Sequence, residues 1–373
     1  ACLAPLVGVL VDRHGGARLM AIGTTLVGVG YLFLGHIDTF TQFVLIRLAI
    51  VTVGDALMGS SVVNIVIAQW FVRQRGRALA ISSMGVGFAK VCMPVVGAWL
   101  IVMFGWRHTW TVFGLGAIVL GVAPALLFVR KSPEDMGLHP DGDPAPSLNP
   151  QAPGARPATA AALRAADNAD VIWAPKEALR TSAFWLLAIT FGIASIGVTG
   201  LNLHIYSYVT DLGHAPVVAA SVMSVIASMQ LASPLAWGFL TERIDARYAA
   251  MIRFVVQGIG LGVAIISGNL VCLYVGFFLY GIGLGGNMVL PDILWAHYFG
   301  RRSLGKIRGM GIFISQVLAA VGPPFFGFLF DITGGYGLSF AIFGIVLMIS
   351  AILSLMLRPP RSAVSKFELR VSH

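Results

Sequence analysis

The chain has 373 residues, of which 57% are hydrophobic and only 11% are charged, and its formal net charge is +9. Soluble domains carry about 25% charged residues, so this composition excludes a water-soluble globular protein and predicts a protein that lies in lipid. Cys2, Cys92 and Cys272 lie in apolar runs without the paired spacing of metal or disulfide sites. We therefore expect no metal and no cofactor.

Apolar segments follow one another along the whole chain and predict an all-α membrane protein. A helix needs about 20 apolar residues to cross the hydrocarbon core of a bilayer. The first segment, 1–11, is shorter than that and is expected to be a partial span. The segments that reach about the required length lie at 18–36, 42–69, 78–104, 107–129, 183–208, 215–240, 248–267, 270–298, 309–330 and 336–357.

Basic residues are concentrated in alternate connections between these segments. Of the 25 Lys and Arg residues, Arg107 alone falls in the opposite set of loops, and Arg47 and Lys90 fall inside segments, which leaves 22 on one side. Cytoplasmic loops carry an excess of Lys and Arg. The positive charge therefore predicts the inner membrane of the cell with a cytoplasmic C-terminus, not a nucleic-acid partner. No oligomer is implied.

One long polar connection divides the chain. Residues 131–181 are rich in Pro, Ala and Asp and cannot bury a core, so we expect a flexible cytoplasmic linker. The predicted division is an N-terminal bundle at 1–130, the linker at 131–181, a C-terminal bundle at 182–358 and a cytoplasmic tail at 359–373.

The two halves resemble each other at an offset of 228 to 230 residues. The recurring landmarks are Gly8, Asp12 and Arg13 with Gly238, Glu242 and Arg243; Trp70-Phe71 with Tyr298-Phe299; and Pro94 and Gly97 with Pro324 and Gly327. Internal repeats of this kind build transporters, and the substrate site lies near the midplane where the repeats meet.

The stretch from Gly8 to Arg18 resembles the signature loop between the second and third helices of the major facilitator superfamily. The segments WFVRQRGRALA, YFGRRSLGKIRG and RKSPEDMGLHPDG are similar to the bacterial branch of the monocarboxylate and oxalate transporter group. The resemblance covers essentially the whole chain and implies two pseudo-symmetric helical bundles around a central cavity. It also implies that 1–11 is the family's second helix, so about 11 of 12 helices are expected and the first is missing.

The signature loop also predicts a gate on the cytoplasmic side. Asp12 can accept hydrogen bonds at the N-terminus of a neighbouring helix, where the helix dipole favours an anion. The alternative is a solvated loop that anchors the chain at the membrane surface. The residues expected to form the two latches are Gly8, Asp12, Arg13, Arg18, Glu242, Arg243 and Arg247.

Ionisable residues inside a bilayer are costly and are functional candidates. Lys90 lies near the middle of its span, and Asp55 lies near the middle of the preceding one. An Asp55–Lys90 pair is plausible, and it would be either structural or a site for a substrate carboxylate and a proton. Asp292 is either a proton site or part of the wet mouth of the cavity. Arg47 lies near an outer end, where interfacial anchoring is the alternative to a role in transport.

Uncharged polar residues complete the predicted site. Gly197 and Gly200 precede a polar run, which indicates a broken helix near the substrate. Single amides more often bond neighbouring helices than contact a ligand, and His204 would either titrate or cap the cavity. The predicted substrate-binding residues are Lys90, Asp55, Asn202, His204, Gln230, Asn287 and Gln316, with Asp55 and Asp292 as proton-coupling candidates.

The span 215–240 lacks the Asp and Arg of lactate-type members, and 309–330 lacks the basic residue of oxalate-type members, so the substrate does not follow from the resemblance.

The chain shows no nucleophile–base set or phosphate loop, which excludes an enzyme. We expect a secondary active transporter that moves a small organic anion, a monocarboxylate, by alternating access as a proton symport. The alternative is a drug or metabolite efflux antiporter of the same superfamily, because Met93-Pro94 to Gly97 partly matches the drug-antiporter element.

Overall fold

The computed structural model describes residues 3–142, 173–266, 269–300, 304–358 and 360, without the side chain of Lys90. These residues form helices and connecting turns, with no strand among them. Most of the predicted linker and the predicted tail fall outside this range. The all-α prediction is confirmed.

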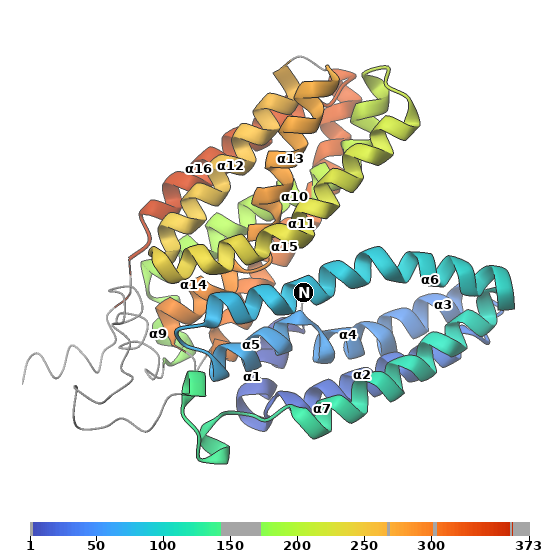
Figure 1. Cartoon of the computed structure of the whole chain (residues 1–373), viewed down its shortest axis with the longest axis vertical. Coiled ribbons are helices and arrows are strands. Elements are labelled where there is room, and N and C mark those ends of the chain that lie inside the picture. Colours follow the sequence, from blue (N-terminus) through green and yellow to red (C-terminus); the bar gives the residue numbers. More distant parts are fainter. Residues whose placement is uncertain (1–2, 143–172, 267–268, 301–303, 359, 361–373) are drawn as a thin grey trace, which may run out of the picture.

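The N-terminal bundle is built from helices that are interrupted by short π-helical turns (Figure 1). Its elements are α1 (Ala4–His14), α2 (Gly16–Leu34), α3 (Phe40–Ile46), η1 (Arg47–Val51), α4 (Thr52–Met58), α5 (Ser60–Trp70), α6 (Arg75–Ala117), η2 (Ile118–Val122) and α7 (Ala123–Phe128).

The helical stretch Arg75–Phe128 is 54 residues long and apolar enough to cross a membrane. At 1.5 Å per residue it would extend about 80 Å as one rod, far beyond the roughly 30 Å hydrocarbon core. Gly105 interrupts α6 with φ 77° and ψ 163°, a backbone conformation outside the helical region. There the chain turns back on itself, as Figure 1 shows. This turn lies between the predicted spans 78–104 and 107–129.

The C-terminal bundle contains longer helices. After the 3-10 turns η3 (Glu134–Met136) and η4 (Pro140–Gly142), its elements are α9 (Pro175–Leu179), α10 (Ser182–Asp211), α11 (Pro216–Arg243), α12 (Ala246–Ile266), α13 (Leu270–Gly286), α14 (Leu290–Phe299), α15 (Leu304–Thr333) and α16 (Gly337–Leu355). Large apolar side chains such as Val102, Phe128 and Ile266 are more than three-quarters exposed, which suits a surface that faces lipid acyl chains.

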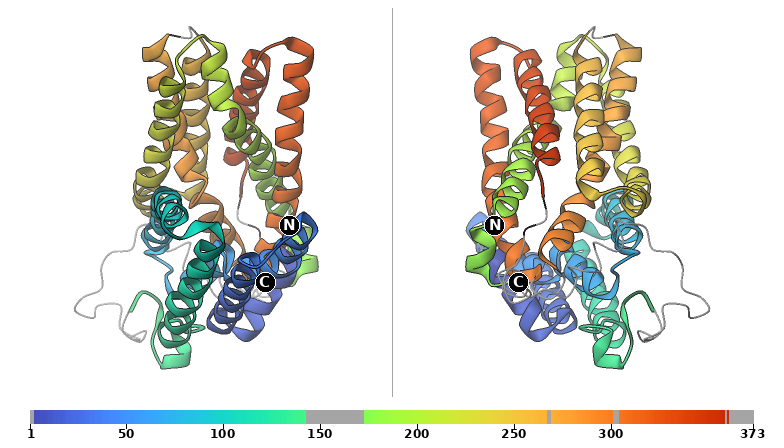
Figure 2. Two further views of the ribbon diagram at one scale, coloured as in Figure 1. Left: turned by 90° about the vertical axis from the view of Figure 1, so that its right-hand side faces the viewer. Right: turned by 90° about the vertical axis from the view of Figure 1, so that its left-hand side faces the viewer.

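The two bundles meet at one end and splay apart toward the other (Figure 1). We call the joined end the linker side, because the chain leaves the N-terminal bundle and enters the C-terminal bundle there. The helix pairs that connect the bundles are α1 with α15, α6 with α11, α5 with α14, α5 with α15 and α6 with α14. Figure 2 shows α1 in dark blue against the lower end of α15, where the bundles converge. The molecule is therefore closed on the linker side.

The predicted break in the helix at Gly197 and Gly200 is wrong, because α10 is continuous from Ser182 to Asp211. A Cβ at Gly197 would overlap the ring of Phe343, and a Cβ at Gly200 would lie 2.9 Å from the carbonyl oxygen of Gly322. These glycines let α10 pack closely on α15 and α16. They do not interrupt the helix.

Two other helices do break, at equivalent places. The backbone is extended at Gly59, between α4 and α5, and it turns at 287–289, between α13 and α14. Gly59 and Asn287 are 228 residues apart, the same offset as the Trp70-Phe71 and Tyr298-Phe299 landmarks. The repeat predicted from sequence therefore places one broken helix in each bundle.

Candidate functional site

Two close helix crossings join the bundles on the linker side, and each needs glycine. α1 crosses α15 at Gly8 and Gly305, where a Cβ on either residue would overlap the other residue's carbonyl oxygen. α6 crosses α11 at Gly76 and Gly238 with the same overlap. The two crossings are related by the repeat, because Gly8 corresponds to Gly238 and Gly305 to Gly76.

Asp12 lies beside the first crossing and caps the N-terminus of α15. Its carboxylate accepts the backbone N–H groups of Gly305 at 3.1 Å and of Lys306 at 2.9 Å. Burial raises the pKa of this carboxyl to about 6, and the two backbone hydrogen bonds oppose that rise. The structure thus gives Asp12 the helix-capping contacts expected from the sequence.

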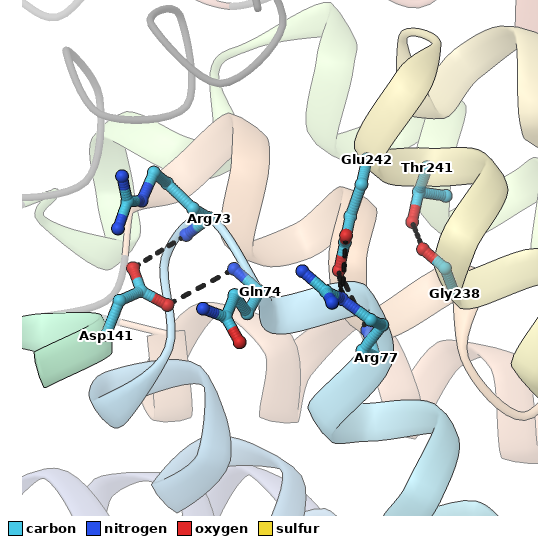
Figure 3. A network of polar contacts seen from close by, with 7 residues as sticks. All are labelled: Arg73, Gln74, Arg77, Asp141, Gly238, Thr241 and Glu242. Atoms are coloured by element: carbon cyan, nitrogen blue, oxygen red, sulfur yellow. Dashed lines mark hydrogen bonds and ion pairs between the residues drawn. The ribbon is translucent and has the colours of Figure 1, made fainter. Parts of the chain in front are cut away.

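Glu242 occupies the corresponding place beside the second crossing (Figure 3). Its carboxylate accepts the Nε–H of Arg77 at 2.9 Å and the backbone N–H of Arg77 at 3.4 Å, at the start of α6. Sequence reasoning placed Arg77 among the loop charges and missed this pair. The repeat could have identified this pair. Asp12 and Glu242 are equivalent at an offset of 230, so Glu242 is expected at the helix start that corresponds to the start of α15, which is the start of α6.

Asp141, in the 3-10 turn η4 after the N-terminal bundle, supports the same helix start. Its carboxylate accepts the backbone N–H groups of Val72, Arg73 and Gln74 at 2.9 to 3.2 Å. Figure 3 shows the bonds from Arg73 and Gln74. The sequence singled out this segment only by its resemblance. The structure shows that it fixes the loop ahead of α6.

The remaining predicted latch residues lie at the rim. Arg13, Arg18 and Arg243 are exposed, and no ion pair is described for them. Arg247 lies 3.7 Å from Asp245 and donates to the carbonyl oxygen of Leu357 at 3.4 Å, both within the C-terminal bundle.

A central cavity of about 580 Å³ lies between the bundles, above the crossings. Both broken helices contribute to its wall, through Gly59 and through Asn287. The polar described residues that line it are Ser60, Ser61, Asn64, Ser82, Ser83, Ser195, Asn287, Asp292, Arg308, Ser315 and Gln316. Phe191, Trp295 and several aliphatic side chains complete a mixed polar and apolar lining. Of the described residues in this lining, only Asp292 and Arg308 carry charge.

These two charges form a buried ion pair at the cavity wall. Arg308 donates from Nε to Asp292, and Asn64 donates from its side-chain amide to the other oxygen of Asp292. Arg308 also donates from Nη1 to the carbonyl oxygen of Ser61 at 3.2 Å. Asp292 and Arg308 are 6% and 5% exposed. The cluster therefore draws Asn64 and Ser61 from one bundle and Asp292 and Arg308 from the other.

A smaller side chamber of about 220 Å³ adjoins the central cavity. Ser61, Arg308, Ile312 and Gln316 line both spaces, and Asp55 lines the side chamber. Asp55 lies 3.7 Å from Arg47, and both side chains are about half exposed. The ion pair described for Asp55 is thus with Arg47, while the side chain of Lys90 lies outside the described residues.

Three other predicted site residues lie away from the two cavities. Asn202 accepts a hydrogen bond from Tyr280 inside the C-terminal bundle, and His204 contacts Tyr336 and stacks on Phe326. Gln230 is not among the described residues that line either cavity. Of the predicted polar residues, the structure brings Asn287, Asp292 and Gln316 together in the central cavity.

Arg308 and Arg253, which the sequence counted with the loops, are buried within helices. Arg308 lies one turn inside α15, because the helix begins at Leu304 and not at 309. Arg253 lies within α12 and donates from Nε to the carbonyl oxygen of Gly283 at 3.0 Å. The neighbouring Arg301, Arg302 and Lys306 made Arg308 look like part of a loop cluster.

Comparisons with known proteins agree over the whole length. The model of the Major Facilitator Superfamily matches residues 1–231 and 216–370. Monocarboxylate transporter 12-B of Danio rerio is 26% identical over 365 residues, which cover 94% of this chain and 74% of the relative.

Solved structures share the fold at low sequence identity. A variant of the Escherichia coli fucose:proton symporter FucP superposes with a TM-score of 0.70 at 13% identity, over 96% of this chain and 88% of that one. The human organic anion transporter MFSD10 (TETRAN) superposes with a TM-score of 0.69 at 16% identity, over 94% and 80%. Both support the two-bundle fold.

Proposed function

Because the chain belongs to the major facilitator superfamily, we propose that it carries a small organic anion, a monocarboxylate, across the membrane by alternating access with proton coupling. The observation that carries this proposal is the central cavity between the bundles, with the Arg308 guanidinium in its wall. A guanidinium binds a carboxylate through two parallel hydrogen bonds. The name of the zebrafish relative supports the same substrate class.

Alternating access requires a gate on each side of the cavity. The crossings Gly8–Gly305 and Gly76–Gly238, with Asp12 and Glu242 beside them, form the gate that is closed here. With the topology predicted from the basic loops, this state is open to the outside and closed to the cytoplasm. The latch function of Asp12 and Glu242 is part of the proposal.

Asp292 is the proposed proton site. When a substrate carboxylate takes over Arg308, Asp292 loses the cation that balances its charge in a buried position. An unpaired buried carboxylate is costly, so Asp292 takes up a proton at that stage. One proton then accompanies each substrate anion, and the net charge of the site does not change.

Secondary proposals for binding the proton or the anion are the Asp55–Arg47 pair and Lys90. Asp55 lies in the adjoining side chamber, where a second proton or anion could bind. Gln316 and Asn287 are proposed to orient the rest of the substrate from the cavity wall. Asn202, His204 and Gln230 would act only indirectly, through the packing of the C-terminal bundle.

Uptake by purified protein in liposomes tests the proposed function. Radiolabelled pyruvate should enter faster when the outside is made acidic, and unlabelled lactate should compete, whereas xylose and a cationic dye should not. Arg308→Lys should raise the KM for pyruvate about tenfold or more, because charge-assisted hydrogen bonds contribute roughly 1.5–3 kcal/mol. Lys90→Ala, measured in parallel, tests the second cation. Transport of the dye without pyruvate uptake would instead establish the efflux alternative.

A further inference from the structure

Asn64 and Asp292 occupy equivalent positions in the two repeats. They are 228 residues apart, the offset that also relates the helix breaks at Gly59 and Asn287. Their hydrogen bond therefore joins α5 to α14 at the pseudo-symmetry axis, on the linker side of the cavity. Opening the linker side separates these half-helices and must break this bond.

The charges of the cluster are not shared between the repeats. Gly305 corresponds to Gly76, and at the same offset of 229 Arg308 corresponds to Leu79. Both charges thus belong to the C-terminal bundle, and the N-terminal bundle contributes only neutral groups, the Asn64 amide and the Ser61 carbonyl. The bundles can separate here by losing two hydrogen bonds, each between a charged group and a neutral one, while the ion pair stays intact.

Arg308 has hydrogen-bonding capacity left for a ligand. A guanidinium carries five N–H donors, and its described contacts use Nε and Nη1. Arg308 lines both the central cavity and the side chamber. A carboxylate that binds end-on to Nη1 and Nη2 competes with the carbonyl oxygen of Ser61 for Nη1.

We propose that Asn64, Asp292, Arg308 and Ser61 form a lock between the bundles, and that the transported anion opens it by binding Arg308. The inference rests on the anion transport proposed above. A ligand shifts a conformational equilibrium only through different contacts in the two states. The anion supplies that difference, because it replaces the Ser61 bond that exists only in the closed state. The same event divides the positive charge of Arg308 between the anion and Asp292, and it leaves the Asn64–Asp292 bond as the remaining contact of the cluster between the bundles.

Hydrogen–deuterium exchange of the full chain in nanodiscs tests the lock at the gate segments 71–80 and 304–312. Asn64→Leu should speed exchange in both segments about three- to tenfold without ligand, as expected for one lost hydrogen bond. Asn64→Ser, a milder change, should act in the same direction. Ser228→Ala is the matched control, because Ser228 bonds only within its own helix and is exposed. Pyruvate should speed exchange in the wild type and have little effect in Arg308→Lys.

The outcomes separate the lock from the proposed function. If pyruvate is transported but the gate segments exchange equally with and without it, the lock is wrong and the transport proposal stands. The lock is also wrong if both Asn64 variants are folded and their gate segments exchange at the same rate as those of Ser228→Ala. If pyruvate is neither transported nor changes exchange, the proposed function and the lock fail together.

Discussion

Single residues in this protein have roles that depend on where a helix begins. Asp12 could be placed from the sequence, because an acid next to the signature glycine suits a helix N-terminus and α15 begins there. Arg308 could not, because four basic residues within eight positions read as a loop. Asn64 was also missed, since a lone amide in a span carries no signal of its own. Adding the repeat offset of 228 to 64 gives Asp292, and this comparison of the two repeats would have identified Asn64 as a candidate.

Removing Arg308 should reveal the buried pair as a stability determinant. Arg308→Ala leaves Asp292 buried without its cation, and breaking a buried pair in this way costs about 3–5 kcal/mol. The double variant with Asp292→Ala should recover most of the lost melting temperature. Equal melting temperatures for the wild type and Arg308→Ala would show that the pair does not stabilise the protein.

Asp12 should make the closed gate depend on pH. Its pKa is raised to about 6 from the ordinary 3.8, so the folded, closed state binds a proton more tightly than the unfolded chain. The stabilising contribution is full below pH 3.8 and is lost as pH rises through about 6. Acidification from pH 7 to 5 should stabilise the wild type by about 1 kcal/mol relative to Asp12→Asn. Melting curves of both proteins at both pH values provide the measurement, and a constant difference between them would contradict the assignment.

At the scale of helices, the internal repeat indicates the positions of the helix breaks better than the local sequence pattern does. The glycines of α10 suggested a break, but they serve close packing on α15 and α16, a tertiary contact that no local pattern reveals. The actual breaks, at Gly59 and 287–289, lie at one repeat offset. Spans and their order follow from apolar length, whereas the contacts between bundles depend on which helices cross.

The glycine crossings predict a sharp difference between two glycines of the same helix. Gly76→Val would push its side chain into the backbone of Gly238, while Gly85→Val points into open space. Gly76→Val should therefore keep the linker side open and reduce pyruvate uptake at least tenfold, with normal membrane insertion. Gly85→Val is the control and should transport like the wild type. Similar uptake by the two variants would rule out the crossing as a gate.

At the scale of the whole molecule, the sequence predicted two bundles, and the structure adds the state in which they are held, closed on the linker side.

The orientation of the chain in the membrane is testable. Because the sequence predicts 22 of the 25 basic residues on one side of the membrane, a fluorescent protein fused after residue 358 should fluoresce in the cytoplasm of a bacterial host. Alkaline phosphatase fused at the same point should be inactive. The reverse pattern would place the linker side outside the cell.

The unequal sharing of charge in the lock has a consequence for membrane potential. Asp292 and Arg308 travel with the same bundle, so the empty transporter moves them together as a neutral pair when it reorients. A lone charge that crossed the full field would feel about 2.3 kcal/mol per 100 mV. The return of the empty carrier should thus run at the same rate in polarised and depolarised vesicles. Pyruvate exchange and net efflux, compared with and without a potassium diffusion potential, would show a voltage-dependent return step if the pair separated during the cycle.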